Sequence, residues 1–240
     1  MLKIRSHLYA TVMLVATVFA NNALSASPSG VFIAGSQYSS DSSYTYAGVV
    51  KPMAGSELGQ GWYNTAILSW LTYRYDTTDF TGAATTIRAS SPGVEAGIGY
   101  GWKGAGHAVS LSTSLGYRNT RVSPFVPAEE KTGSILTISP QVQWSVALSP
   151  RLTASTLASY AFGQQSGYAR ARLMWETTSH WSAGVQETYL KGQNYRTTQH
   201  GVVLAHDLAN GYVIEGAAGM SRPRDGDDSG YVAVGLSRAF

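Results

Sequence analysis

Six residues with ionisable side chains lie within segments whose other residues are mainly apolar or small. They are Glu95, Tyr168, Arg170, Arg172, Glu176 and Glu215. Ionisable groups at membrane depth are costly unless they pair with one another or meet water. These residues therefore predict one of two arrangements. The first is a set of ion pairs that fills an interior, and the second is a polar path or docking surface whose arginines and Tyr168 contact a sugar chain.

The histidines offer a different chemistry. A membrane lipid hydrolase would pair a histidine with a serine and a carboxylate near one rim. The candidates are His107, His180, His200 and His206. Serine is so common in this chain that no local motif selects a nucleophile. Because there is also no phosphate-binding glycine loop and no metal-ligand spacing, we expect no enzyme activity, no metal and no cofactor. A hydrolase remains an alternative.

The elements that carry these residues have a period of two. In residues 93–102 ("GVEAGIGYGW"), Val94, Ile98 and Trp102 alternate with glycines and with Glu95. Alternation predicts a strand with one apolar face and one bare face. Four glycines on one face indicate a tightly curved wall with little room inside.

About twelve such segments follow one another, each closed by Gly, Pro, Asn, Asp or Ser. Terse connectors such as "KGAG" and "LSPR" alternate with longer ones such as "DTTDFTGAATT" and "RVSPFVPAEEKTG". Short turns at one end and long loops at the other are typical of outer-membrane barrels, whose short turns face the periplasm. We therefore expect an all-β fold, a single antiparallel up-and-down transmembrane β-barrel of about twelve strands, with ten or fourteen as alternatives. Pro140 requires a bulge or register break.

The two faces of these segments predict which side meets lipid. Large apolar residues oppose serine, threonine, glutamine and glycine, and aromatic residues gather near the segment ends, as interfacial girdles do. The polar faces, with the six residues above, should line the lumen. Glu187 falls on an apolar face, so either it lies above the hydrocarbon or the register slips there.

The start of the chain predicts export. Residues 1–26 combine Lys3 and Arg5, an apolar run and small residues near Ala26, as a cleaved secretory signal does. Residues 27–240 then form the outer-membrane barrel, in contact with outer-membrane lipid. The chain has no cysteine and a net charge of +3. Its cationic residues are scattered, which argues against a nucleic-acid partner.

Several segments together resemble a known family. They are "YSSDSSYTYAGVV", "GWYNTAILSWLTYRYD", "GVEAGIGYGW", "YARARLMW" and the closing "GYVAVGLSRAF". The chain resembles the cellulose biosynthesis protein BcsS family over about residues 30–240. The resemblance implies a barrel of a Gram-negative envelope that is accessory to cellulose synthesis or export, and so to biofilm exopolysaccharide. It also implies a cellulose chain, or another component of the cellulose synthase complex, as partner.

The resemblance supplies no catalytic residue. An uncharged, flat polymer would be held by aromatic stacking and by hydroxyl or amide contacts. Barrels of eight strands are filled by side chains, and open porin channels need about 16 to 18 strands. We therefore expect an organising or docking role for a twelve-stranded barrel rather than a conduit. A small porin-like channel unrelated to cellulose is the other alternative.

Overall fold

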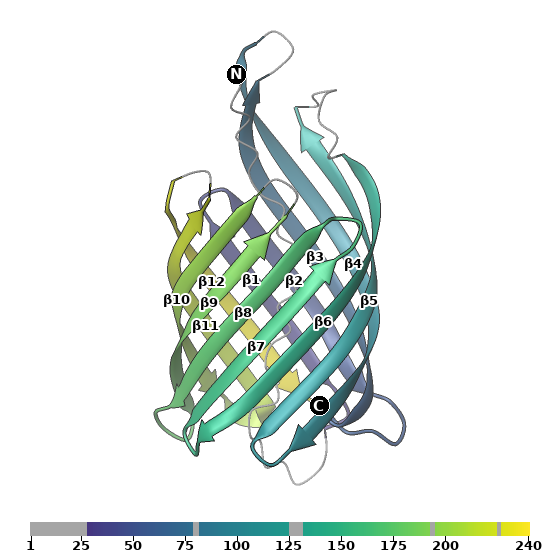
Figure 1. Ribbon diagram of the computed structural model, residues 1–240, viewed down its shortest axis with the longest axis vertical. Coiled ribbons are helices and arrows are strands. Elements are labelled where there is room, and N and C mark those ends of the chain that lie inside the picture. Colours follow the sequence, from purple (N-terminus) through teal and green to yellow (C-terminus); the bar gives the residue numbers. More distant parts are fainter. Residues whose placement is uncertain (1–27, 79–81, 125–131, 193–194, 225–226) are drawn as a thin grey trace.

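A computed structural model describes residues 28–78, 82–124, 132–192, 195–224 and 227–240, and they form one closed antiparallel barrel of twelve strands (Figure 1). The strands are β1 (Val31–Ser39), β2 (Ser42–Pro52), β3 (Gly61–Thr78), β4 (Ala84–Gly104), β5 (His107–Ser123), β6 (Gly133–Ser149), β7 (Leu152–Ala161), β8 (Ser166–Glu176), β9 (Trp181–Lys191), β10 (Arg196–Asp207), β11 (Tyr212–Pro223) and β12 (Ser229–Ala239). A single 3-10 turn, Ala209–Gly211, precedes β11. The predicted fold class and strand number are confirmed.

The barrel closes between the first and last strands. β1 pairs with β12 from Val31 opposite Ala239 to Ser39 opposite Tyr231. The backbone N–H groups of Gly30 and Phe240 each donate to the other's carbonyl oxygen at 3.0 Å. Every other strand pairs with its neighbours in sequence, so no sheet edge remains open along the ring. The predicted signal, residues 1–26, lies outside the described residues.

One end of the barrel is uneven, because four strands are longer than the other eight. β3 to β6 contain 17 to 21 residues, whereas the other strands contain 9 to 12. Figure 1 shows the ends of β3, β4 and β5 standing above the rest of the barrel. We call this end, which bears the β3–β4 and β5–β6 connections, the long-loop rim. The opposite end, which bears the two-residue β4–β5 connection, is the short-turn rim.

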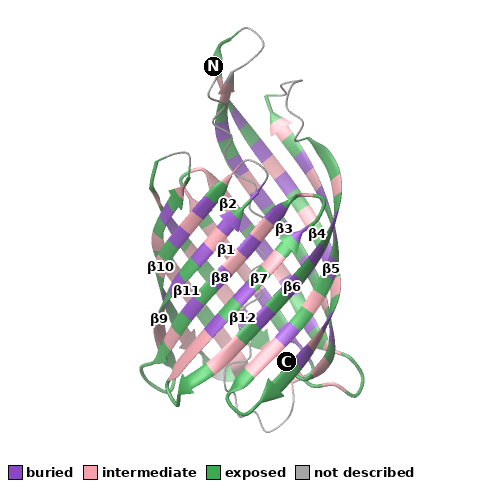
Figure 2. Cartoon of the chain, in the orientation of Figure 1, coloured by how far each residue is buried: buried purple, intermediate pink, exposed green. Residues whose placement is uncertain are grey.

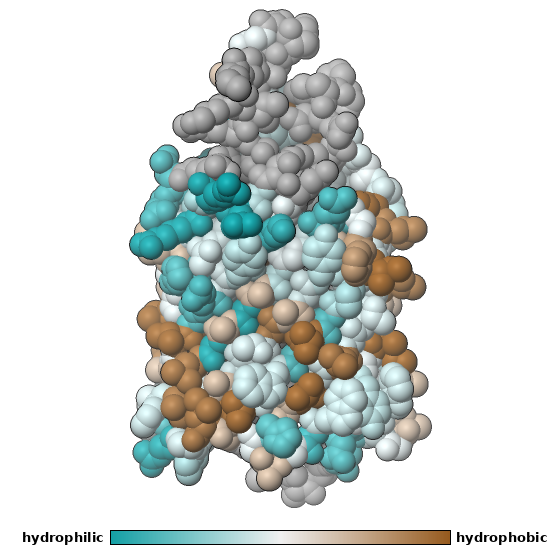
Figure 3. Space-filling view, viewed as in Figure 1, coloured by the Kyte–Doolittle hydropathy of each residue, from teal (hydrophilic) through white to brown (hydrophobic). Residues whose placement is uncertain are grey.

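The two faces of the wall are as predicted. Along β5 and β6, Leu115 and Leu136 are 68% and 75% exposed, while Ser114 and Thr137 are 6% and 7% exposed. Figure 2 shows this alternation as stripes of buried and exposed residues along the longer strands of the wall. Apolar side chains gather on the outer wall in Figure 3, below a polar region near the long-loop rim. Large apolar residues thus point outward and small polar ones inward.

Aromatic residues mark the two edges of the outer apolar band. Trp62 and Trp70 lie eight positions apart on β3, as do Trp181 and Tyr189 on β9. At about 3.3 Å per residue and a tilt of about 40°, eight residues rise roughly 20 Å. This height is close to the band of about 25 Å that aromatic girdles flank in membrane barrels. No helix among the described residues is long and apolar enough to cross a membrane.

Two prolines within strands coincide with gaps in the hydrogen-bonded ladder. The β4–β5 ladder skips Ser91 and Pro92, although the β3–β4 ladder runs through both. The β6–β7 ladder stops at Gln141, one residue after Pro140, and resumes only as an isolated bridge. Proline has no N–H to donate, so each proline stands where one neighbour is not paired. The register is the same on both sides of each gap.

The inward glycines make room for large residues on adjacent strands. A Cβ at Gly93 would lie 3.0 Å from Cζ of Arg118, and one at Gly116 would lie 3.0 Å from Cγ of Glu95. The bare face predicted from residues 93–102 therefore serves the packing of charged side chains inside the barrel.

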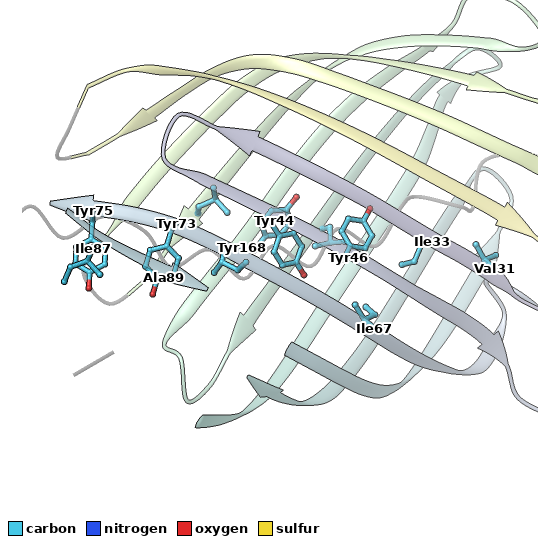
Figure 4. Packing of buried hydrophobic residues seen from close by; sticks show 13 residues of the cluster. Val31, Ile33, Tyr44, Tyr46, Ile67, Tyr73, Tyr75, Ile87, Ala89 and Tyr168 are labelled. Atoms are coloured by element: carbon cyan, nitrogen blue, oxygen red, sulfur yellow. The ribbon is translucent and has the colours of Figure 1, made fainter. Parts of the chain in front are cut away.

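The interior also contains an apolar cluster that the alternation did not predict. Its buried members are Val31, Ile33, Tyr44, Tyr46, Ile67, Leu71, Tyr73, Tyr75, Ile87, Ala89, Leu157, Tyr168 and Leu190 (Figure 4). They come from β1 to β4 and from β7 to β9, two groups of strands that are not neighbours in the ring. The cluster therefore joins opposite walls across the interior. Side chains bridge the lumen.

Candidate functional site

The strongest polar contact of the interior is a two-point ion pair between β8 and β11. Arg172 donates from Nη1 and Nη2 to the two carboxylate oxygens of Glu215, at 2.7 and 2.6 Å. Its Nε donates to Oε1 of Gln186 on β9 at 2.9 Å, and Nε2 of Gln186 donates to the Tyr231 hydroxyl on β12 at 3.0 Å. Strands β8 and β11 are three apart in a ring of twelve, so the pair spans a quarter of the circumference. This network ties β8, β9, β11 and β12 together.

Arg170 and Tyr168 lie beside this network on the same inward face of β8. Both are 4% exposed. Nη1 of Arg170 is buried and has no hydrogen-bond partner among the described residues, and the same holds for the Tyr46 hydroxyl on β2. Tyr168 belongs to the apolar cluster that also contains Tyr46. Buried polar atoms almost always have partners, so unpaired ones are places where a polar ligand or water can bind.

A second polar group lies on the opposite wall, on β3 to β5. Glu95 is 6% exposed and accepts a hydrogen bond from the Ser114 hydroxyl at 3.2 Å. Arg118 donates from Nη1 to the Ser91 carbonyl at 2.6 Å and from Nη2 to the Ser69 hydroxyl at 2.8 Å. The Ser91 carbonyl belongs to the ladder gap beside Pro92. Arg118 thus satisfies a backbone group that the proline leaves unpaired.

The structure brings five of the six predicted residues into the interior. Glu215 joins Arg172, Tyr168 and Arg170 lie next to them, and Glu95 lies on the other wall. Glu176 is the last residue of β8 and is exposed at the short-turn rim, away from the other five. Arg118 is a further charged residue of the interior, which the sequence did not single out. Its place in the alternation, four positions after Ser114 on the polar face of β5, would have found it.

Glu187 lies on the outward face of β9 without a slip of register. It points outward, directly opposite His200 on β10, with 3.9 Å between its Oε2 and the histidine Nδ1. The β9–β10 register is continuous from Lys191 to Trp181. Glu187 lies two residues from Tyr189, which marks the long-loop edge of the apolar band, so its carboxylate lies within the band and close to that edge.

The histidines do not form a hydrolytic triad in the part of the chain that the structure describes. His206 Nδ1 lies 3.0 Å from the His180 carbonyl oxygen, and its ring stacks on Trp181. His107 Nδ1 lies 3.3 Å from the Ala105 carbonyl oxygen. Within the described ranges, none of these histidines hydrogen-bonds a serine hydroxyl. Among the described residues, the interior offers buried polar atoms without partners and no hydrogen bond between a serine and a histidine.

The geometry is that of a membrane-type barrel with charged groups held inside. The sequence model of the family described as "Cellulose biosynthesis protein BcsS" matches residues 31–240, from the start of β1 to the end of the chain. The chain belongs to the BcsS family. This match confirms the resemblance drawn from the strand segments. Among curated proteins, none matches the chain in sequence.

Solved structures with a similar fold are barrels of the outer-membrane type. The KdgM porin in complex with disordered oligogalacturonate has a TM-score of 0.55 at 11% identity, over 88% of this chain and 99% of that chain. An outer membrane channel from Pseudomonas putida F1 has a TM-score of 0.56 at 10% identity, over 89% and 96%. The translocator domain of the autotransporter NalP from Neisseria meningitidis has a TM-score of 0.55 at 11% identity, over 88% of each chain. At these identities the likeness shows the fold alone, which is that of outer-membrane barrels.

Proposed function

We propose that this member of the BcsS family is a non-enzymatic barrel of the bacterial outer membrane that assists cellulose synthesis or export. The observation that carries the proposal is the family match over the whole barrel, together with a polar interior that offers unpaired hydrogen-bonding atoms. Export through a cleaved signal, residues 1–26, is part of the proposal. The long-loop rim then faces the outside of the cell and the short-turn rim faces the periplasm.

An organising role fits the interior better than a conduit does. The apolar cluster bridges opposite walls, and the Arg172–Glu215 pair crosses a quarter of the ring. A cavity of about 30 Å³ lies among Gln37, Tyr44, Leu71 and Gln199, at the long-loop end of the interior. A water molecule needs at least about 10 to 15 Å³ of such space, so this cavity holds one or two waters and not a sugar ring.

Tyr168 and Arg170 are the residues we propose for contact with the polysaccharide or with a synthase component. Because both are 4% exposed, this contact requires the side chains that bridge the lumen to move apart. An aromatic ring can stack on the flat face of a glucose unit, and a guanidinium can donate to its hydroxyls. Because Nη1 of Arg170 has no partner among the described residues, a sugar hydroxyl or a peptide carbonyl would satisfy it without breaking an existing bond.

The test is complementation of a strain that lacks the gene, with secreted cellulose measured by a glucan-binding dye. We expect the deletion to lower cellulose and the wild-type gene to restore it. We expect the variant Y168L/R170Q, which removes the aromatic ring and the guanidinium, to restore less. The matched control is Y189L/R196Q, which makes the same two chemical changes on outward-facing residues, where Arg196 lies 5.8 Å over the Tyr189 ring.

The amount of folded barrel is checked by its heat-modifiable mobility on gels. Unchanged cellulose in the deletion strain would overturn the accessory role. Full restoration by Y168L/R170Q would leave that role intact and overturn the contact assigned to Tyr168 and Arg170. A stable open conductance of purified protein in planar bilayers would favour the porin-like channel, and lipid turnover lost on substitution of His206 would favour the hydrolase.

A further inference from the structure

A hollow of about 580 Å³ opens on the outer wall at the long-loop rim, beside the β1–β2 turn. Three strands line it with runs of three residues, Thr72–Arg74, Arg88–Ser90 and Arg121–Ser123. In each run the middle residue points inward, as the burial of Tyr73 and Ala89 shows, and the outer two point outward. The hollow therefore lies over the outer face of β3, β4 and β5 and not inside the barrel.

Three arginines meet at this hollow. Arg74 on β3 stands directly opposite Arg88 on β4, and Arg121 on β5 lies diagonal to Arg88, whose direct partner is Ser123. Like charges directly opposite one another destabilise a sheet. Among the lining residues Asp41 is the one carboxylate, and it pairs with Arg74 at 2.8 Å. Three positive charges against one negative charge leave the hollow with a net charge of about +2.

Arg88 and Arg121 contribute no ion pair to the fold among the described residues. Both are exposed. On the far wall at the same rim, Arg222 pairs with Asp228 at 3.2 Å and Arg196 lies over the Tyr189 ring. The cluster on β3 to β5 instead offers two exposed arginines without a carboxylate partner in the described ranges.

The surface beneath the hollow is suited to lipid. Trp70 lies below Thr72 and Arg74 on the same face of β3, is 55% exposed, and donates from Nε1 to the Ser90 hydroxyl at 3.0 Å. Leu68 and Val94 continue the outward face towards the middle of the band, at 63% and 47% exposure. From the rim towards the middle of the wall, the outer face thus presents cations, an indole ring and then aliphatic side chains. This order is the one expected at the headgroup level of a bilayer.

We propose that Arg74, Arg88 and Arg121 bind the phosphate groups of a glycolipid in the outer leaflet, with its acyl chains on the wall below Trp70. Guanidinium groups bind phosphate oxygens through paired, charge-assisted hydrogen bonds. The proposal rests on the proposed outer-membrane location, and it places the β3–β5 wall against a fixed lipid. A lipid held there would stabilise the tall strands that rise above the rest of the rim.

The experiment measures binding to the full-length, signal-cleaved barrel in detergent by native mass spectrometry. The probes are bisphosphorylated lipid A, the same lipid without its phosphates, and inorganic phosphate. The test variant is R88Q/R121Q, which keeps the Arg74–Asp41 pair. The control is K103Q/R151Q, which removes two exposed cations at the short-turn rim and so changes the net charge equally.

We expect the wild type and the control to bind the phosphorylated lipid, and R88Q/R121Q to bind it about tenfold more weakly or worse. The dephosphorylated lipid should not show this difference. Equal binding by wild type and R88Q/R121Q would overturn the proposal. Inorganic phosphate that binds as tightly as the lipid would also overturn it, since the ligand would then be a free anion. Lipid binding is measured on purified protein. Unchanged cellulose in the deletion strain would therefore refute the accessory role and leave the lipid-binding result unaffected.

Discussion

Replacement of Glu215 by alanine should strongly destabilise the folded barrel. The change removes both short hydrogen bonds to Arg172 and leaves that arginine, whose side chain is 3% exposed, with an unbalanced charge. Removing one partner of a buried ion pair typically costs about 3 to 5 kcal/mol. Glu215 itself is 24% exposed, so water can reach the site and the lower end applies. A loss of about 3 kcal/mol lowers the folding equilibrium constant roughly 150-fold.

A double variant without either charge separates the lost charge balance from lost packing. The variant R172M/E215L removes both charges together. Its main remaining cost is Oε1 of Gln186, which loses its donor, so we expect a change of about 1 to 2 kcal/mol. Unfolding by urea in phospholipid vesicles, followed by fluorescence of the six tryptophans, gives the free energies. The control E187A changes an exposed, outward carboxylate and should stay within about 0.5 kcal/mol of wild type.

Two results would refute this reasoning. One is a stability of E215A within about 1 kcal/mol of the wild type, since an unpaired buried guanidinium should cost more than that. The other is a double variant as unstable as E215A, which would mean that the loss comes from packing and not from charge.

Three further predictions concern the wall, the glycine face and a loop. Replacement of the outward-facing Leu115 by arginine should cost about 2 to 4 kcal/mol in the same vesicle assay, and an arginine that costs nothing there would contradict lipid exposure. G93A should cost about 1 to 2 kcal/mol, because the new Cβ would lie 3.0 Å from the guanidinium of Arg118, and the cost should shrink in an R118M background. Burial raises the pKa of the Tyr195 hydroxyl in the β9–β10 loop, so the unfolded chain loses this proton first, above about pH 10. The contribution of Tyr195 to the free energy of unfolding should therefore be fully present below about pH 10 and be lost as the pH rises further. The free energy of unfolding of Y195F should fall less steeply with pH, and equal slopes for the two proteins would refute a raised pKa at Tyr195.

The alternation of residues was enough to predict the wall of the barrel. A strand's side chains must divide between two faces, so Leu115 and Ser114 could be assigned to opposite sides without knowledge of their neighbours. The closing contact of β1 with β12 follows from the same pattern, because a barrel must pair its first and last strands. Five of the six candidate charged or tyrosine residues, which the alternation assigns to the polar face, lie in the interior.

The contacts between strands could not be predicted in the same way. The partner of Arg172 depends on the register of β8 to β11 and on the curvature of the ring. Neither can be derived from the residues of a single strand. Glu176 shares the inward face of β8, yet it ends the strand and meets solvent, because the position of a strand end within the membrane is set by its turn. The basic hollow on β3 to β5 requires Arg74, Arg88 and Arg121 to meet from segments far apart in the chain.

The tyrosine-rich cluster was missed for a related reason. Tyr44, Tyr46, Tyr73 and Tyr75 lie on inward faces, although tyrosines elsewhere form the outer girdles. Residue type alone does not separate the two uses. The neighbours in alternation do not separate them either. Tyr44 and Tyr46 alternate with Ser43, Thr45 and Ala47, a pattern that on other strands places the large residues outward.

Accessibility along β5 tests the central claim most directly. The chain has no cysteine, so single cysteines at Leu111, Leu115, Ser110 and Ser114 can each carry a spin label without background. We predict that labels at Leu111 and Leu115, in barrels reconstituted in lipid, collide with oxygen dissolved in the bilayer. Labels at Ser110 and Ser114 should be shielded from it. The opposite pattern, or no alternation between the two sets, would contradict a barrel with an apolar outside and a polar, bridged interior.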